Sequence, residues 1–212
     1  FWLGKTEVTQ GQWEAVMGSL PDLSCFGGPH GVGAYYPVYC VSWDEVAGPN
    51  GFVDRLNTYL VSTSQPAGLR LPTEAEWERA ARGGNQYRFS HGDVLECEEH
   101  LCPPCAAHEQ YMWWCGNDNP HGTKPVGSKQ LNAYGLFDMH GGVYEWVQDW
   151  FQEHLGESPV TDPTGPGTGY NRVLRGGGWP NDAMFCRSAN RSNTTPDDYD
   201  YYMGFRLAVT AP

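Results

Sequence analysis

The segment from residue 172 to residue 207 constrains this chain more than any other. It opens on Arg175-Gly176-Gly177-Gly178-Trp179 and closes on Gly204-Phe205-Arg206-Leu207, and both ends have the character of framework. Between them Asn, Asp, Ser, Thr and Tyr predominate, without a helix or strand period. A rigid scaffold around a polar, aromatic insert is a common way to present a recognition loop, and Tyr offers a large contact area for few rotatable bonds. The composition also leaves open an ordinary solvated loop.

Length and composition favour a loop-rich, aromatic-packed globular protein of one large domain or two small ones. Because we find no internal repeat, linker or low-complexity tail, we expect a single α+β domain over the whole chain, residues 1–212. Only 18% of the residues are charged, whereas 14% are Phe, Trp or Tyr, and glycines number 27. The net charge of -12 repels nucleic acid and anionic membrane surfaces. No apolar run reaches the length of a membrane helix. We therefore expect neither a nucleic-acid partner nor membrane insertion.

The seven cysteines favour an oxidising location, which is extracellular, cell-surface or periplasmic. Cys25 and Cys40 flank a glycine-rich loop and are candidates for one disulfide. A second cluster forms either two disulfides or a tetrahedral zinc site with His100 and His108 nearby. The cluster consists of Cys97, Cys102, Cys105 and Cys115. Cys186 is then left alone, and we expect it to be a buried structural thiol.

Three capping boxes predict where helices begin: Thr9 to Gln12, Ser42 to Glu45 and Thr73 to Glu76. The first helix should cover residues 10–17. The second is interrupted at Gly48-Pro49, and a helical face resumes at Phe52. Beyond Asn85 we expect only short strands and loops. The expected strands are residues 143–150, 173–174 and 205–209.

Several of these stretches together carry a family resemblance. They are Lys5–Thr9, Pro37-Val38 with Val41–Trp43, Leu69–Glu78, Asn132–Trp146, Arg172–Trp179 and Gly204–Arg206. In this order they resemble the formylglycine-generating-enzyme, or sulfatase-modifying-factor, family, a branch of the C-type-lectin fold. The resemblance implies short helices, small twisted antiparallel sheets and long loops. The resemblance also implies that the family's first strands, ahead of the Thr6-Glu7-Val8-Thr9 block, lie outside this sequence, and we expect Phe1 to be in a strand interior.

The enzymatic members of that family imply an oxidoreductase. They use two cysteines, five positions apart, that follow the Gly-Gly-x-Trp strand and bind copper through soft thiolates. Aligned on Arg191, those positions fall on Ala183 and Ser188, and Cys186 lies alone between them. We therefore expect no copper and lean against an enzyme, with the family oxidase as the alternative.

A second branch with the same fold, the variable proteins of diversity-generating retroelements, is similar in its C-terminal segment. In that branch adenine-directed mutagenesis samples Asn, Asp, Tyr, Ser and Thr, which are the residue types found here. The resemblance implies a non-catalytic protein that binds a protein or cell-surface ligand; a structural surface module is a further alternative. The expected ligand-binding residues are Trp179, Asn181, Asp182, Ala183, Met184, Phe185, Asn190, Ser192, Asn193, Thr194, Thr195, Asp197, Asp198, Tyr199, Asp200, Tyr201, Tyr202 and Met203. Residues 186–191 would be mostly framework.

The family also implies a calcium site. Asp138 and Glu145 match its side-chain ligands, and Gly141 and Val143 match its backbone carbonyl ligands. Calcium prefers several oxygen ligands, which a glycine-rich turn with two carboxylates can supply. Gly142 replaces the usual Asn, and we expect it to alter the turn more than the ligands. The alternative for Glu145 is a buried hydrogen-bond acceptor beside Trp146.

Overall fold

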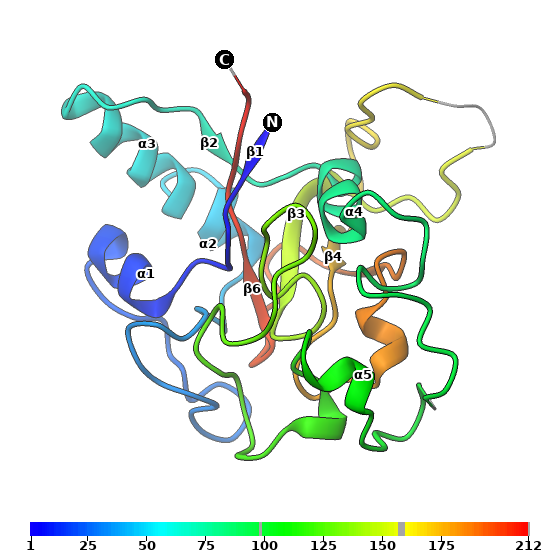
Figure 1. Cartoon of the computed structure of the whole chain (residues 1–212). Helices are drawn as coiled ribbons and strands as arrows, with labels where there is room; N and C mark the ends of the chain where they lie inside the picture. The colour runs from blue at the N-terminus through cyan, green and yellow to red at the C-terminus, as the bar shows by residue number, and fades with distance from the viewer. Residues whose placement is uncertain (98, 157–159, 212) are drawn as a thin grey trace.

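Two small sheets form the centre of the protein. The computed structural model describes residues 1–97, 99–156 and 160–211 (Figure 1). One sheet is antiparallel, with the strand order β1-β7-β2. The other has the order β5-β4-β3-β6, and in it β3 and β6 run parallel, which departs from the antiparallel pairing expected. The strands are β1 (Trp2–Leu3), β2 (Leu69–Arg70), β3 (Tyr144–Trp150), β4 (Arg172–Arg175), β5 (Ser192–Thr194), β6 (Met203–Phe205) and β7 (Ala208–Val209).

The four longer helices begin where the sequence predicts. They are α1 (Gln10–Met17), α2 (Trp43–Ala47), α3 (Phe52–Ser62) and α4 (Glu74–Arg82). All three capping boxes form: the side chains of Thr9, Ser42 and Thr73 each accept a hydrogen bond from the backbone N–H three residues later, and the reciprocal bond is present. α1 and α4 end at Gly18 and Gly83, which adopt the left-handed conformation that glycine permits.

Three short elements were not predicted. They are α5 (Ala106–Glu109) and two 3₁₀ turns, η1 (Cys115–Asn117) and η2 (Ala183–Cys186). None is long enough to show an apolar period, so the sequence gives no signal for them. The single strand expected over residues 205–209 is likewise divided between β6 and β7, which belong to different sheets.

β5, within the polar segment that showed no helix or strand period, was not predicted either. This strand pairs antiparallel with β4, and the partners are Leu174 with Ser192 and Arg172 with Thr194. A Ser-Asn-Thr strand has no apolar alternation, and its pairing depends on a partner remote in sequence.

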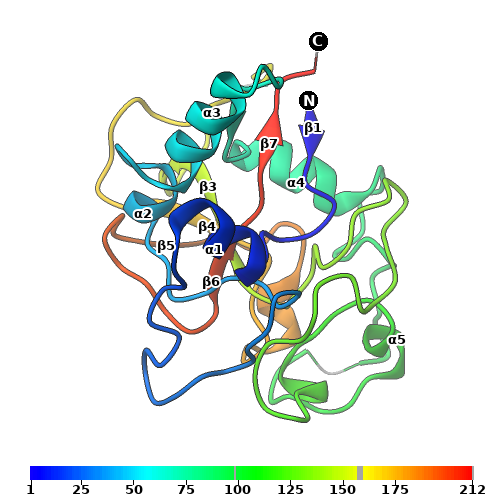
Figure 2. The same cartoon turned by 90° about the vertical axis from the view of Figure 1, so that its left-hand side faces the viewer.

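The buried hydrophobic residues form several clusters, each of which combines residues remote in sequence. Trp13, Phe52 and Phe205 pack in the main cluster, where the rings of Trp13 and Phe52 stack at 5.4 Å. A second cluster contains Trp114 and Cys186. Figures 1 and 2 place both chain ends at one end of the molecule and α5 at the other. Among the described residues no helix is long and apolar enough to cross a membrane.

Candidate functional site

Residues 179–203, here called the recognition segment, begin and end in the core. Trp179 is 1% exposed and Met203 is 7% exposed. Between them the chain is held by Arg175 of β4, which is itself fully buried. The Arg175 guanidinium donates to the Ser188 carbonyl at 2.9 Å and forms an ion pair with Glu78 at 2.5 Å. These contacts of Arg175 with main-chain oxygen atoms fix the path of the segment. They do not depend on the identity of the side chains on the segment, which can therefore differ.

The middle of the segment behaves as the framework expected from the sequence. Arg191 binds both carboxylate oxygens of Glu74 in α4, at 2.5 and 2.8 Å. Ser188 is buried. Arg187 extends in the other direction and pairs with the buried Glu99. Bidentate Arg–carboxylate contacts impose a defined geometry, so these residues position the segment.

The first half of the segment, residues 181–187, rests on the loop from residue 97 to residue 115. The Cys115 N–H donates to the Asn181 carbonyl at 3.2 Å, and the Met184 N–H donates to the Glu99 carbonyl at 3.3 Å. This loop has little apolar periodicity of its own. Its support for the segment therefore depends on what holds the loop together.

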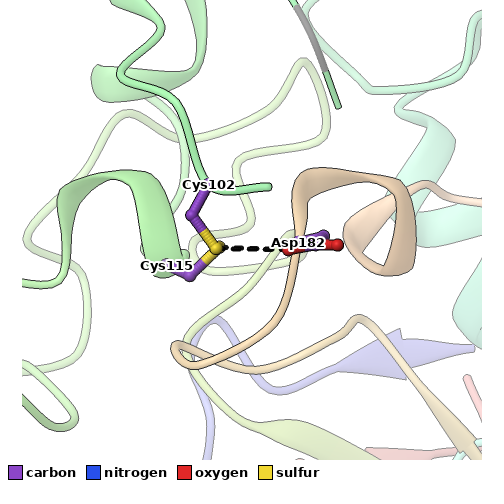
Figure 3. A group of neighbouring side chains, drawn as sticks. All are labelled: Cys102, Cys115 and Asp182. Atoms are coloured by element: carbon purple, nitrogen blue, oxygen red, sulfur yellow. Dashed lines mark hydrogen bonds between the residues drawn. A yellow bond between two sulfur atoms is a disulfide. The ribbon is translucent and has the colours of Figure 1, made fainter. Parts of the chain in front are cut away.

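Disulfides hold that loop. Cys97 pairs with Cys105 and Cys102 pairs with Cys115, so the disulfide alternative is the one formed. The Asp182 carboxylate oxygen lies 3.2 Å from the Cys102 sulfur (Figure 3). Bonded sulfurs carry no proton and are not thiolates, so this contact is neither a hydrogen bond nor a zinc site.

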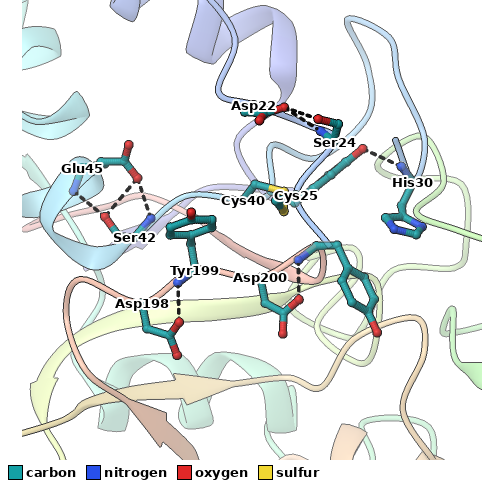
Figure 4. The surroundings of a disulfide bond; sticks show 12 residues. Asp22, Ser24, Cys25, His30, Cys40, Ser42, Glu45, Asp198, Tyr199 and Asp200 are labelled. Atoms are coloured by element: carbon teal, nitrogen blue, oxygen red, sulfur yellow. Dashed lines mark hydrogen bonds between the residues drawn. A yellow bond between two sulfur atoms is a disulfide. The ribbon is translucent and has the colours of Figure 1, made fainter. Parts of the chain in front are cut away.

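The second half, residues 195–202, rests on a different disulfide loop. Cys25 and Cys40 are joined, as predicted. The Cys40 N–H donates to the Asp200 carbonyl at 3.1 Å, and the Asp44 N–H donates to the Pro196 carbonyl at 3.0 Å. Figure 4 shows Tyr199 and Asp200 beside this disulfide. Each half of the segment thus has its own disulfide-closed support, and the bonds again go to main-chain oxygen.

The predicted ligand-binding residues divide by exposure. Phe185, Asp197, Asp198 and Tyr199 are exposed, with Tyr199 46% exposed. A larger group is half-buried: Asn181, Asp182, Met184, Asn190, Ser192, Asn193, Thr194, Thr195, Asp200, Tyr201 and Tyr202. Trp179, Ala183 and Met203 are buried, and their assignment to the contact surface is wrong. The physical reason is that all three pack beneath the surface that their neighbours form.

Sequence reasoning missed three aromatic residues of this surface. The His30 ring lies 4.7 Å from Tyr201, and the Phe26 ring lies 6.2 Å from Tyr199. His121 packs edge-on against Trp179 at 4.5 Å. Burial lowers the pKa of His30, and the nearby His121 acts in the same direction. No local pattern marks these residues, because they come from loops far away in the sequence.

The two positions to which the resemblance assigns the family's reactive cysteine pair contain no thiol. Ala183 and Ser188 are both fully buried. Cys186 between them is a free, fully buried cysteine, as expected. Burial strongly raises the pKa of the Cys186 thiol. A side chain at Gly177 would come within 2.7 Å of its sulfur, which shows how tightly Cys186 is enclosed. A protonated, enclosed thiol is inert.

Glu145 lies at the centre of a buried hydrogen-bond cluster. Its carboxylate accepts hydrogen bonds from Arg206 at 2.6 and 2.7 Å and from the Trp77 indole at 2.7 Å. Both Glu145 and Arg206 are fully buried. The carboxylate is thus already neutralised by a guanidinium. This agrees with the alternative that Glu145 is a buried hydrogen-bond acceptor. It also makes Glu145 a poorer candidate for a calcium ligand.

Asp138 fits a cation better. One of its carboxylate oxygens accepts from the Gly127 N–H at 2.6 Å, and the other is buried without a partner among the described residues. Glu7 also has a buried oxygen without a partner there. Burial raises the pKa of both carboxyl groups. Gly141, at φ +75°, and Val143 lie in the adjoining turn. Calcium binding stays a prediction, with Asp138 as its strongest ligand.

The fold is that of the formylglycine-generating-enzyme class. A solved structure titled Treponema denticola variable protein 1 is 31% identical, with a TM-score of 0.76, and the match covers 98% of this chain and 83% of that one. PvdO from Pseudomonas aeruginosa is 26% identical, with a TM-score of 0.74, over 97% of this chain and 78% of that one. The pattern of the sulfatase-modifying factor enzyme 1-like domain matches residues 1–211, and the chain belongs to that family.

The relatives of this chain include proteins named formylglycine-generating enzyme. The formylglycine-generating enzyme of Streptomyces coelicolor is 36% identical over 96% of this chain and 60% of its own length. That of Mus musculus is 35% identical over 82% of this chain and 44% of its own length. The chain thus spans less than two thirds of these relatives.

Proposed function

We propose that this domain is a non-catalytic binding protein, and that its recognition segment is the diversified surface of a retroelement variable protein. One observation carries the proposal: the segment is fixed mainly through main-chain bonds and through Arg175, Arg187 and Arg191. Most Asn, Asp, Ser, Thr and Tyr side chains on it have no core role, so they can be exchanged without loss of the fold. The similarity to a solved variable protein supports this.

The family oxidase is the competing function, because several relatives are named for it. Its chemistry needs two thiolates, and Ala183 and Ser188 supply none. We expect no conversion of a cysteine-containing peptide to the formylglycine form in the presence of copper and oxygen, as measured by mass spectrometry. Formation of that product at enzymatic rates would contradict the proposal.

A peptide-display selection against the immobilised domain tests the binding function. Selected peptides should bind wild type and lose most of their affinity for Tyr199→Ala/Tyr201→Ala. The matched control is Tyr59→Ala/Tyr170→Ala, which removes two exposed tyrosines elsewhere. If both double variants bind equally well, or if no peptide binds, the recognition segment is not the binding surface. The partner class is a protein or cell-surface ligand, and the disulfides fit an oxidising location.

A further inference from the structure

We propose that the second half of the recognition segment, together with the Cys25–Cys40 loop, binds a basic protein segment through arginine side chains. This inference rests on the proposed binding function and specifies the chemistry of the partner. The surface, here called the acidic aromatic face, consists of Asp22, Phe26, Glu45, Asp197, Asp198, Tyr199, Asp200 and Tyr201.

The face is built from two parts of the chain that are remote in sequence. The Cys40–Asp200 and Asp44–Pro196 backbone bonds join the parts, and the Phe26 ring lies 6.2 Å from Tyr199 and 6.4 Å from Tyr201. Figure 4 shows Asp22, Glu45, Asp198 and Asp200 around the disulfide. The disulfide closes the loop that holds Phe26 against the segment, so the face has a fixed shape before a partner arrives.

The charge of the face has one sign. No Lys or Arg occurs between Lys5 and Arg55, nor between Arg191 and Arg206. The ion pairs of the described residues leave out all five carboxylates of the face. Asp198 and Asp200 accept only local hydrogen bonds, such as those from the N–H groups of the residues that follow them. These charges are therefore available to a cationic partner.

The histidines next to the face do not neutralise it. His30 is half-buried, and burial lowers its pKa, which favours the neutral ring. His121 forms its own pair with Asp118 at 2.5 Å. The net charge of the chain, -12, adds a long-range attraction for cations.

The aromatic rings favour arginine over lysine as the contact residue. Phe26 is 64% exposed and Tyr199 is 46% exposed. A guanidinium can stack on such rings while its N–H fork binds a carboxylate, which an ammonium group cannot do. The chain already uses this contact internally: the Arg172 guanidinium lies 3.6 Å from the Trp43 ring centre and 3.4 Å from that of Trp150.

The test uses a defined probe: a fluorescent peptide with five arginines spaced by Gly-Ser, beside matched lysine and glutamate peptides. Anisotropy titrations at low and at physiological salt should show binding in the order arginine, lysine, glutamate. The variant Asp197→Asn/Asp198→Asn/Asp200→Asn should weaken arginine-peptide binding roughly tenfold or more. The control Glu14→Gln/Glu96→Gln/Glu153→Gln removes the same total charge from exposed residues elsewhere and should change affinity much less.

A second pair of variants tests the rings. Phe26→Ala/Tyr199→Ala should reduce the preference for arginine over lysine, whereas Tyr59→Ala/Tyr170→Ala should leave it unchanged; thermal melts confirm that each variant folds. Equal weakening by the two charge variants would overturn the proposal, since it would show attraction by net charge alone. If peptides selected by display bind through Tyr199 and Tyr201 but are acidic or neutral, the basic partner is overturned and the binding function stands.

Discussion

His108 makes the stability of this domain sensitive to acid. Its ring is fully buried, 4.6 Å from the Phe89 ring and 5.6 Å from that of Trp114. Burial lowers the pKa of His108 from 6.5 to about 4; nearby Glu96 opposes this shift and nearby Arg88 adds to it. The folded protein therefore keeps the ring neutral at pH values where the unfolded chain protonates it.

The sign of the effect follows from the protons bound in each state. Between pH 6.5 and 4 the unfolded state binds more protons, so stability that is complete above pH 6.5 is lost as the pH falls through this window. One pKa unit corresponds to about 1.4 kcal/mol, so His108 alone should cost about 2 kcal/mol at pH 5. The Nε2 atom of His91 lies 3.0 Å from the Nδ1 atom of His108. Burial is the main cause that lowers the pKa of His91 to about 3, so His91 also destabilises the folded protein as the pH falls.

Urea unfolding at pH 7.5 and pH 5.0 measures this loss. In His108→Phe the drop in the free energy of unfolding between the two pH values should be about 2 kcal/mol smaller than in wild type. Phe packs between the same rings and does not titrate. Groups of opposite sign, such as Asp149 with its pKa raised by burial to about 6, act equally in both proteins and cancel. His154→Phe, at an exposed site, should keep the wild-type drop. An equal drop in wild type and His108→Phe would refute the reasoning.

Three further predictions concern the framework. Arg206→Met should lower the free energy of unfolding by about 3 to 5 kcal/mol, because the buried Glu145 carboxylate loses its partner; a loss below 1 kcal/mol in urea unfolding contradicts this. In Cys25→Ser/Cys40→Ser the free energy of unfolding should fall by about 3 kcal/mol, because the disulfide closes a loop over a 15-residue separation. This variant should also bind the selected peptides more weakly; unchanged binding argues against a supporting role for the disulfide. Saturating calcium should raise the wild-type melting temperature by about 5 °C or more, and Asp138→Asn should abolish most of that rise; equal rises exclude Asp138 as a ligand.

Local signals in the sequence predicted the helices well. The boxes at Thr9, Ser42 and Thr73 each depend on residues three positions apart, so all the required information lies within one turn. The two framework ends of the recognition segment were also predictable, because Arg175–Trp179 and Gly204–Arg206 lie in stretches that resemble the family. The Cys25–Cys40 disulfide was predictable because the two cysteines flank one glycine-rich loop.

Contacts remote in sequence decided what could not be predicted. Trp179 was expected to bind the ligand, but it packs against His30, His121 and Tyr201, none of which is near it in the chain. β5 exists because β4 supplies its hydrogen bonds. The same limit hid the acidic aromatic face, since Phe26 and Tyr199 meet only after folding.

The central claim, that the recognition segment is diversified for binding, is tested most directly by sequencing the encoding locus. We predict a near-copy of the region encoding residues 179–203 beside a reverse-transcriptase gene, with differences concentrated at adenines. Those differences should fall on the exposed and half-buried positions and spare the buried Trp179, Ala183 and Met203. A locus without such a copy, or with differences spread equally over buried and exposed codons, would contradict it.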